Sequence, residues 1–120
     1  MIESYKDLKV WQRSMDLVCA TYSMSQALPR EELFGLTSQM RRSAVSIPSN
    51  IAEGYGRDNT GDYVHMLRIA QGSLKELETQ LMIASRVGWV DTTATQPALT
   101  ICDEVGRMLR ALIRSIEGNR

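Results

Sequence analysis

The sequence has few of the residues on which metal-dependent or nucleophilic catalysis relies. It contains one histidine, His65, and two cysteines that lie far apart with no CxxC pair. A di-metal site in a helical bundle needs Glu-x-x-His pairs on two helices, but here only Asp62 precedes a histidine at that spacing. A Walker loop and a GxGxxG motif are also absent, because Gly54-Tyr55-Gly56 lacks the lysine and the strand that such loops require. The sequence therefore predicts no catalytic, cofactor-binding or metal-binding residue.

The chain also lacks an excess of charge and any long apolar run. It has 14 basic and 14 acidic residues, seven of each in either half. No stretch approaches the roughly 18 apolar residues of a membrane span, and the acidic N-terminus does not resemble a signal peptide. Cys19 and Cys102 both fall in apolar helical patterns, so we predict that both are buried thiols. These features favour a reduced, cytoplasmic protein.

Apolar residues recur at steps of three and four along most of the chain, which is the pattern of amphipathic helices. No alternating segment bounded by hairpin turns indicates a strand. Helices are predicted over residues 4–27, 31–55 and 60–87, and from Thr92 or Thr95 to about residue 117. Their boundaries are marked by Pro29, by Asn59 or Thr60 as an N-cap, and by Gly88 before a buried Trp89-Val90 connector. Residues 1–120 are thus predicted to form one domain, an all-α, antiparallel up-and-down four-helix bundle.

The predicted core is formed by one apolar stripe on each helix. Along the chain these stripes are Leu8, Trp11, Met15, Val18 and Tyr22; Leu33, Leu36, Met40, Ala44, Ile47 and Ile51; Val64, Leu67, Leu74, Leu77, Leu81 and Ala84; and Ala98, Cys102, Val105, Leu109, Leu112 and Ile116. The first helix has a second apolar line, formed by Val10, Leu17 and Met24. Because one stripe is enough to pack the monomer, the second line suggests a subunit or partner interface.

The second helix contains Pro48 within its apolar repeat, which predicts a kink because proline removes one backbone donor. Helical spacing places five polar residues on one outward stripe: Arg42, Ser46, Ser49, Glu53 and Arg57. At the edge of the core, Asn50 is suited to fixing the register and Gly54 to close helix packing. Glu53 and Arg57 are spaced for an intrahelical ion pair. Alternatively, the outward stripe contacts a neighbouring subunit or a partner.

Three helices place basic residues opposite their core stripe. These candidate nucleic-acid-binding residues are Lys6, Lys9 and Arg13; Arg68, Lys75 and Arg86; and Arg107, Arg110 and Arg114. Such stripes attract a phosphate backbone through local potential even when the net charge is zero. They are more often typical of a solvated outer face, and Asp16 and Asp103 lie close enough to weaken two of them.

Three segments carry a resemblance to a known family: YKDLKVWQRSMDLV (residues 5–18), RRSAVSIPSNIAEGYGR (41–57) and YVHMLRIAQGSLKELETQLMIASRVGWV (63–90). They resemble the four-helix-bundle family named for proteins encoded within 23S rRNA intervening sequences. Its relatives include the accessory variability determinants of diversity-generating retroelements. The resemblance implies an antiparallel bundle that assembles as a homopentamer. In the retroelement relatives it also implies a basic surface that binds nucleic acid and an association with a reverse transcriptase.

Those retroelement relatives are strongly basic, whereas this chain is neutral. The resemblance supplies no catalytic residues. Two hypotheses therefore follow from the sequence. In the first, the chain is a non-enzymatic, homo-oligomeric scaffold or accessory protein that binds RNA or DNA through its basic stripes. In the second, it is an interaction module that binds only protein.

Overall fold

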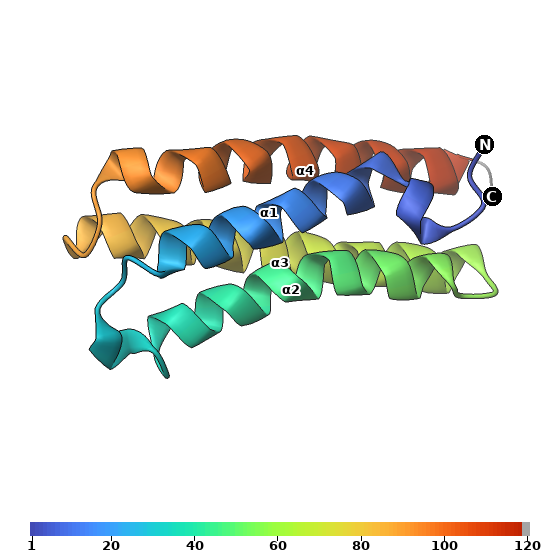
Figure 1. Cartoon of the computed structure of the whole chain (residues 1–120). Coiled ribbons are helices and arrows are strands. Elements are labelled where there is room, and N and C mark those ends of the chain that lie inside the picture. The colour runs from blue at the N-terminus through green and yellow to red at the C-terminus, as the bar shows by residue number, and fades with distance from the viewer. Residues whose placement is uncertain (119–120) are drawn as a thin grey trace.

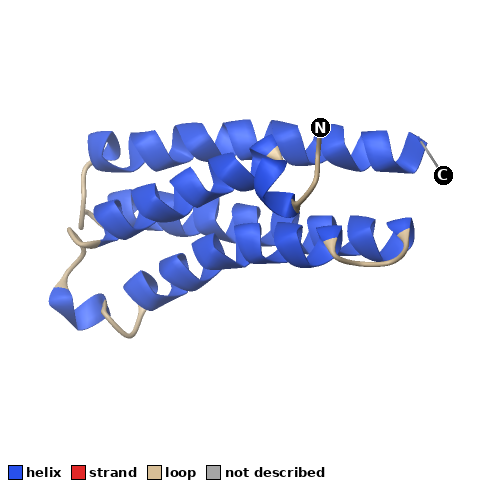
Figure 2. Cartoon of the chain, turned by 45° about the vertical axis from the view of Figure 1, so that its right-hand side comes forward, coloured by secondary structure: helices blue, strands red, loops and turns tan. Residues whose placement is uncertain are grey.

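The chain forms a bundle of four long helices in a computed structural model, which describes residues 1–118. The elements are η1 (Tyr5–Asp7), α1 (Lys9–Ser25), η2 (Arg30–Glu32), α2 (Leu36–Tyr55), α3 (Thr60–Arg86) and α4 (Thr92–Gly118), where η marks a 3₁₀ helix. Successive helices run in alternating directions, and the bundle measures 47 × 24 × 20 Å (Figure 1). The described residues contain no strand, as the colouring of Figure 2 shows. The predicted all-α four-helix fold is confirmed.

Short polar contacts set the helix ends. The Asn59 side chain accepts a hydrogen bond of 2.8 Å from the Asp62 N–H, so Asn59 is the N-cap of α3, as predicted. Gly88 follows α3 with a φ of +83°, a conformation that glycine adopts without strain. The first helix starts later than predicted, because Ser4 and Asp7 cap a separate 3₁₀ turn and Leu8 is extended.

The core stripes predicted for the last three helices are largely correct. Every predicted stripe residue of α3 is buried, as are Leu36 to Ile51 of the α2 stripe and Ala98 to Leu109 of the α4 stripe. Leu33 is exposed, because it belongs to the turn that separates η2 from α2. Trp89 is also exposed, so the prediction of a buried connector is wrong at that position.

The stripe predicted for the first helix is only partly correct. Leu8, Trp11 and Val18 are half-buried and pack against the core, but the line predicted as an interface supplies the buried residues. Val10, Leu17 and Met24 are buried in the core of the monomer and are not an outward interface. Met15 and Tyr22 of the predicted core stripe are 39% and 41% exposed.

The physical reason is that two small polar residues complete the true core stripe of α1. Ser14 and Thr21 are fully buried between the apolar residues of this stripe. Their hydroxyls donate hydrogen bonds of 2.8 Å to the carbonyls of Trp11 and Leu17, which removes most of the cost of burying them. Because α1 packs with this stripe toward the core, Cys19 lies on the exposed side of the helix. The prediction of a buried thiol is therefore wrong for Cys19 and correct for Cys102.

The second helix continues through Pro48 as one helix, and the predicted kink stays a prediction. Small residues bring α2 close to α3. A Cβ atom added at Gly54 would lie 2.9 Å from the Cβ of Met66, and the hydroxyls of Ser46 and Ser73 lie 2.7 Å apart across the two helices. The prediction that Gly54 permits close helix packing is confirmed.

Candidate functional site

The first candidate surface is a basic groove between α3 and α4. Two adjacent hollows of about 300 and 230 Å³ form it. Gln71 and Arg110 line both hollows, so the two are continuous. The other lining residues are Arg68, Gly72, Leu74, Lys75, Gly106, Ile113, Arg114 and Glu117. We call this surface the α3–α4 basic groove.

Two glycines keep this groove open. A Cβ atom at Gly72 would have no atom within 4 Å, and at Gly106 it would lie 3.4 Å from Leu74 Cδ2 and 3.8 Å from Arg110 Nη1. Larger side chains at these positions would therefore occupy the hollow without a clash. Gly72 and Gly106 thus leave space between the long cationic side chains of α3 and those of α4.

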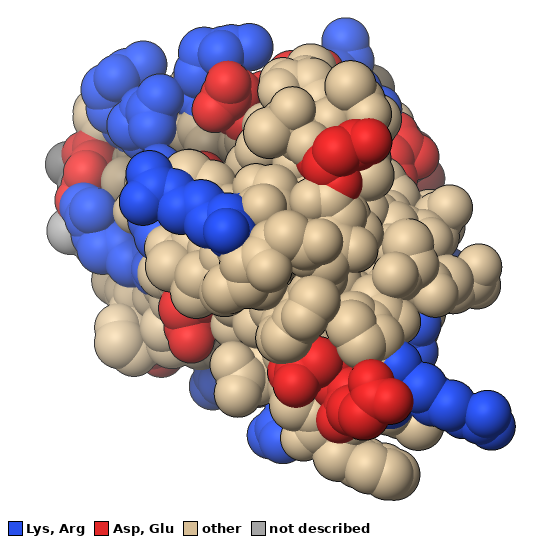
Figure 3. Space-filling view, turned by 90° about the vertical axis from the view of Figure 1, so that its left-hand side faces the viewer, with Lys and Arg blue, Asp and Glu red and all other residues tan. Residues whose placement is uncertain are grey.

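Positive charge predominates in and beside the groove. Arg110 and Arg114 line it, while Arg107 lies one turn before them on the same exposed side of α4. None of these three arginines forms an ion pair with another residue in the described part of the chain. In Figure 3, Lys and Arg side chains gather at the upper left, over α3 and α4.

Two cations of α3 in this groove are paired with carboxylates. Arg68 bonds Glu117 at 3.3 Å, and Lys75 bonds Glu78 at 3.3 Å. Because most of these side chains are well exposed, such pairs are weak and exchange readily with water. They lower the local potential without neutralising the groove.

The basic residues predicted on the first helix do not join this groove. Arg13 bonds both carboxylate oxygens of Glu104 on α4, at 2.8 and 3.0 Å, and also bonds Asp16. The hydrogen bond with Arg13 lowers the pKa of Glu104, and the pKa of Arg13 is raised, chiefly by the same bond. Arg13 therefore holds α1 against α4. Lys6 and Lys9 are exposed on the α1 side of the bundle, and Arg86 lies at the end of α3 beyond the groove.

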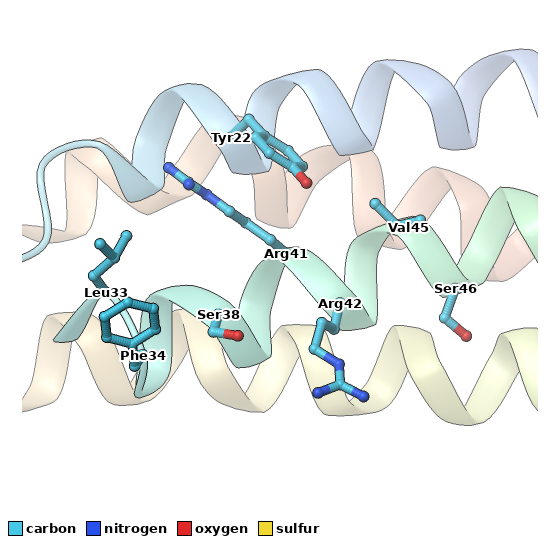
Figure 4. Close-up of a pocket in the computed structure, with 8 residues that line it drawn as sticks. All are labelled: Tyr22, Leu33, Phe34, Ser38, Arg41, Arg42, Val45 and Ser46. Carbon is cyan, nitrogen blue, oxygen red and sulfur yellow. The ribbon is translucent and has the colours of Figure 1, made fainter.

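The second candidate surface is an apolar groove between α1 and α2, which sequence reasoning missed. Its two hollows share Val45 and are otherwise lined by Tyr5, Trp11, Met15, Val18, Tyr22, Leu33, Phe34, Ser38, Arg41, Arg42, Ser46, Pro48, Ser49 and Ala52. The larger hollow measures about 660 Å³ (Figure 4). We call this surface the α1–α2 apolar groove. The signal in the sequence was the Leu33-Phe34 pair before Gly35, next to the first apolar line of α1.

Two residues of this groove have notable positions. Phe34 is 93% exposed, which is unusual for a side chain of its size. The guanidinium of Arg41 lies 4.8 Å from the centre of the Tyr22 ring and donates a hydrogen bond of 2.9 Å to the Ser25 hydroxyl. Arg41 thus crosses from α2 to α1, whereas Arg42 points away from Tyr22 (Figure 4).

The predicted outward stripe of α2 is divided between two roles. Arg42, Ser46 and Ser49 line the α1–α2 apolar groove together with Pro48. Glu53 and Arg57 form the predicted intrahelical ion pair, at 3.1 Å. Asn50 donates hydrogen bonds to the Ser46 carbonyl and hydroxyl, at 2.7 and 2.9 Å, so its contacts stay within α2. The Ser46 and Ser73 hydroxyls make the polar contact to α3 that was expected of Asn50.

Side chains that could bind a metal ion or act as nucleophiles are scattered over the part of the chain that the structure describes. Within residues 1–118, no three His, Cys, Asp or Glu side chains are grouped so that they could hold a metal ion. His65 is exposed on α3. Burial raises the pKa of the Cys102 thiol to about 12, which keeps it protonated at neutral pH. None of the helices described here is long and apolar enough to cross a membrane.

Comparison with known proteins agrees with this fold. A crystal structure of a protein of unknown function from the S23 ribosomal protein family of Bacteroides thetaiotaomicron is similar, with a TM-score of 0.80 and 23% sequence identity. The similarity covers 88% of this chain and 98% of that one. No curated protein matches the chain. The family model of the 23S rRNA-intervening sequence proteins matches residues 6–111, and the chain therefore belongs to this family.

Proposed function

We propose that this chain is a non-enzymatic, homo-oligomeric accessory protein that binds the phosphate backbone of nucleic acid in its α3–α4 basic groove. The observation that carries the proposal is the position of Arg107, Arg110 and Arg114, free of ion pairs within residues 1–118, beside Arg68 and Lys75 of α3. A row of exposed cations along a groove binds a polyanion by releasing its counterions. The neutral net charge does not oppose this, since local potential governs the encounter.

The lining of the groove favours binding of the backbone over reading of the bases. No aromatic side chain lines it, so bases have no platform on which to stack. Guanidinium groups bind phosphate oxygens with two parallel hydrogen bonds and carry no sequence information when they do so. We therefore expect binding that depends strongly on salt and weakly on sequence.

The test is fluorescence anisotropy of labelled RNA and DNA over a salt series. We expect the double variant Arg110→Gln/Arg114→Gln to bind about tenfold or more weakly than wild type at low salt. Its plot of log affinity against log salt should be shallower by about two, one for each lost phosphate contact.

The matched control removes the same charge elsewhere. Lys6→Gln/Lys9→Gln changes two exposed cations of the N-terminal segment, outside the groove, and should leave affinity and salt slope close to wild type. Equal losses in both double variants would contradict a groove-specific site. Absence of binding at low salt would contradict the function itself and would favour an interaction module that binds only protein.

An accessory protein that binds nucleic acid without catalytic groups of its own would assist an enzyme that acts on nucleic acid. A reverse transcriptase in the cytoplasm is the partner that the family resemblance implies. Co-expression of the chain with a reverse transcriptase encoded beside its gene, followed by affinity purification, tests this part. Loss of co-purification in a variant of the groove would indicate that nucleic acid bridges the two proteins.

A further inference from the structure

We propose that a small hollow between the end of α1 and the start of α2 binds a phosphate monoester group. The hollow measures about 220 Å³ and lies where the chain leaves α1 and passes through η2, at the lower left of Figure 1. Its polar and charged lining residues are Ser25, Gln26, Arg30, Thr37 and Arg41. We call it the α1–η2 hollow. It shares no residue with the α3–α4 basic groove.

The charge of the α1–η2 hollow is positive. Arg30 and Arg41 line it, no carboxylate does, and neither arginine forms an ion pair within residues 1–118. Of the two acids that follow Arg30 in sequence, Glu31 is exposed. The other, Glu32, accepts a hydrogen bond of 3.0 Å from the Leu36 N–H, which holds its carboxylate at the start of α2. Two guanidinium groups without a carboxylate between them favour an anionic ligand.

Arg41 is held in position by α1. Its Nε donates a hydrogen bond of 2.9 Å to the Ser25 hydroxyl, which in turn donates to the Tyr22 carbonyl at 3.1 Å. The guanidinium also lies beside the Tyr22 ring (Figure 4). Its two terminal nitrogens form no hydrogen bond in the part of the chain that the structure describes. Arg41 is therefore oriented before a ligand arrives and retains the two donors that bind a phosphate in parallel.

Thr37 supplies a buried hydroxyl without a partner. The residue is 4% exposed, and its hydroxyl forms no hydrogen bond among residues 1–118. The hydroxyl is not sealed in the core, since Gln80 Oε1 is the fully buried side-chain atom that lacks a partner in those residues. Its exposed part therefore opens to the α1–η2 hollow, which Thr37 lines. A buried hydroxyl without a hydrogen bond is costly, and a phosphate oxygen in the hollow would accept one from it.

The number and direction of the donors favour a phosphate monoester over other anions. Arg30 approaches from η2, Arg41 and Thr37 from α2, and the Gln26 carboxamide from the end of α1. A monoester carries a charge of about −1.5 to −2 at pH 7 and three strong acceptor oxygens, so it matches two guanidinium groups and further donors. A carboxylate has one charge and two oxygens in one plane. A phosphodiester in a nucleic-acid backbone also has a single charge.

The experiment is an NMR titration of the isotope-labelled chain with inorganic phosphate, at an ionic strength held constant with sodium chloride. The starting protein is Arg110→Gln/Arg114→Gln, because the α3–α4 basic groove also attracts phosphate. The amide signals of Ser25, Thr37 and Arg41 should shift along a saturating curve. Acetate should bind at least tenfold more weakly. Absence of these shifts would overturn the phosphate site and would leave the proposed binding of nucleic acid, which depends on the other groove, unaffected.

Charge removal in the same background tests which residues bind the phosphate. Arg30→Gln and Arg41→Gln should each weaken phosphate binding about tenfold or more. Arg86→Gln is the matched control, since Arg86 is an exposed cation at the end of α3 without an ion pair in the described residues; it should leave the affinity unchanged. Equal weakening by all three substitutions would indicate a response to total charge and would contradict the site.

Thr37→Val separates binding from folding. Valine has a similar shape and no hydroxyl, so without phosphate this variant should unfold at a higher urea concentration than the starting protein. Its affinity for phosphate should nevertheless fall about fivefold. A variant that loses stability together with affinity would indicate that the hydroxyl has only a structural role, which would contradict its part in the site.

Two further ligands identify the source of the monoester, which occurs both on small metabolites and at the ends of nucleic acids. Adenosine monophosphate represents the first source, and a short oligonucleotide with a terminal phosphate represents the second. At least one should bind more tightly than inorganic phosphate, and the same oligonucleotide with a terminal hydroxyl should not shift the signals of Ser25 and Thr37. Binding of inorganic phosphate but of neither ester would overturn the monoester as the ligand.

Discussion

Gly54 is the residue at which α2 and α3 come closest. A Cβ atom there would lie 2.9 Å from the Cβ of Met66 and 3.1 Å from the Cδ1 of Tyr63. We expect Gly54→Ala to reduce the free energy of unfolding by about 1–3 kcal/mol, since the added methyl group forces two packed helices apart.

Gly72 provides the matched control for this substitution. It lies within α3, and an added Cβ atom would have no neighbour within 4 Å. Gly72→Ala should therefore raise the free energy of unfolding by about 0.5–1 kcal/mol, because alanine restricts the unfolded chain. Urea unfolding followed by circular dichroism measures both. Equal effects of the two substitutions would show that Gly54 is not under steric constraint.

The two cysteines should differ in reactivity. Cys19 is exposed, whereas Cys102 is buried and its pKa is raised to about 12. In native protein at pH 8, a thiol reagent should modify one cysteine per chain rapidly, and the second only in urea. Because thiolate is the reacting form, native Cys102 should stay unreactive well above pH 8. The variant Cys19→Ser should lose the fast phase; fast modification of that variant would contradict the burial of Cys102.

At the scale of the element, α1 shows what an apolar count does not reveal. Its two lines of apolar residues are similar in length, and the helical spacing favours the line with five apolar residues over the line with three as the core. The true core stripe contains Ser14 and Thr21, whose burial depends on hydrogen bonds to their own helix. The pattern predicted α3 correctly because that helix has a single strong apolar line.

The exchange of the two faces of α1 can be measured directly. We expect Leu17→Ala to reduce the free energy of unfolding by about 2–5 kcal/mol, because it leaves a cavity in the core. Met15→Ala, at a 39% exposed position, should cost about 0.5 kcal/mol or less. Urea unfolding followed by circular dichroism measures both. A larger loss of unfolding free energy for Met15→Ala than for Leu17→Ala would indicate that Met15, and not Leu17, lies in the core.

At the scale of the whole molecule, the charge distribution depends on which helices are neighbours. The sequence indicated three basic stripes of equal standing. The fold joins those of α3 and α4 into one groove, while Arg13 of the third forms an ion pair with Glu104. The α1–α2 apolar groove likewise needs two helices and the η2 turn in place, so no single segment of sequence could predict it. A helix can be predicted from the spacing of its own residues, whereas a groove depends on which helices pack side by side in the bundle.

The homo-oligomeric part of the proposed function predicts how the length of a nucleic acid affects its binding. An oligomer repeats the α3–α4 basic groove, so a long polyanion can contact several grooves at once and bind more tightly than to one. We expect wild type to bind a long RNA about tenfold or more tightly than an oligonucleotide of about eight nucleotides, which spans a single groove. Anisotropy at one fixed salt concentration measures both ligands, and Arg110→Gln/Arg114→Gln should weaken the binding of both. Equal affinity for the short and the long ligand would show that the grooves act independently.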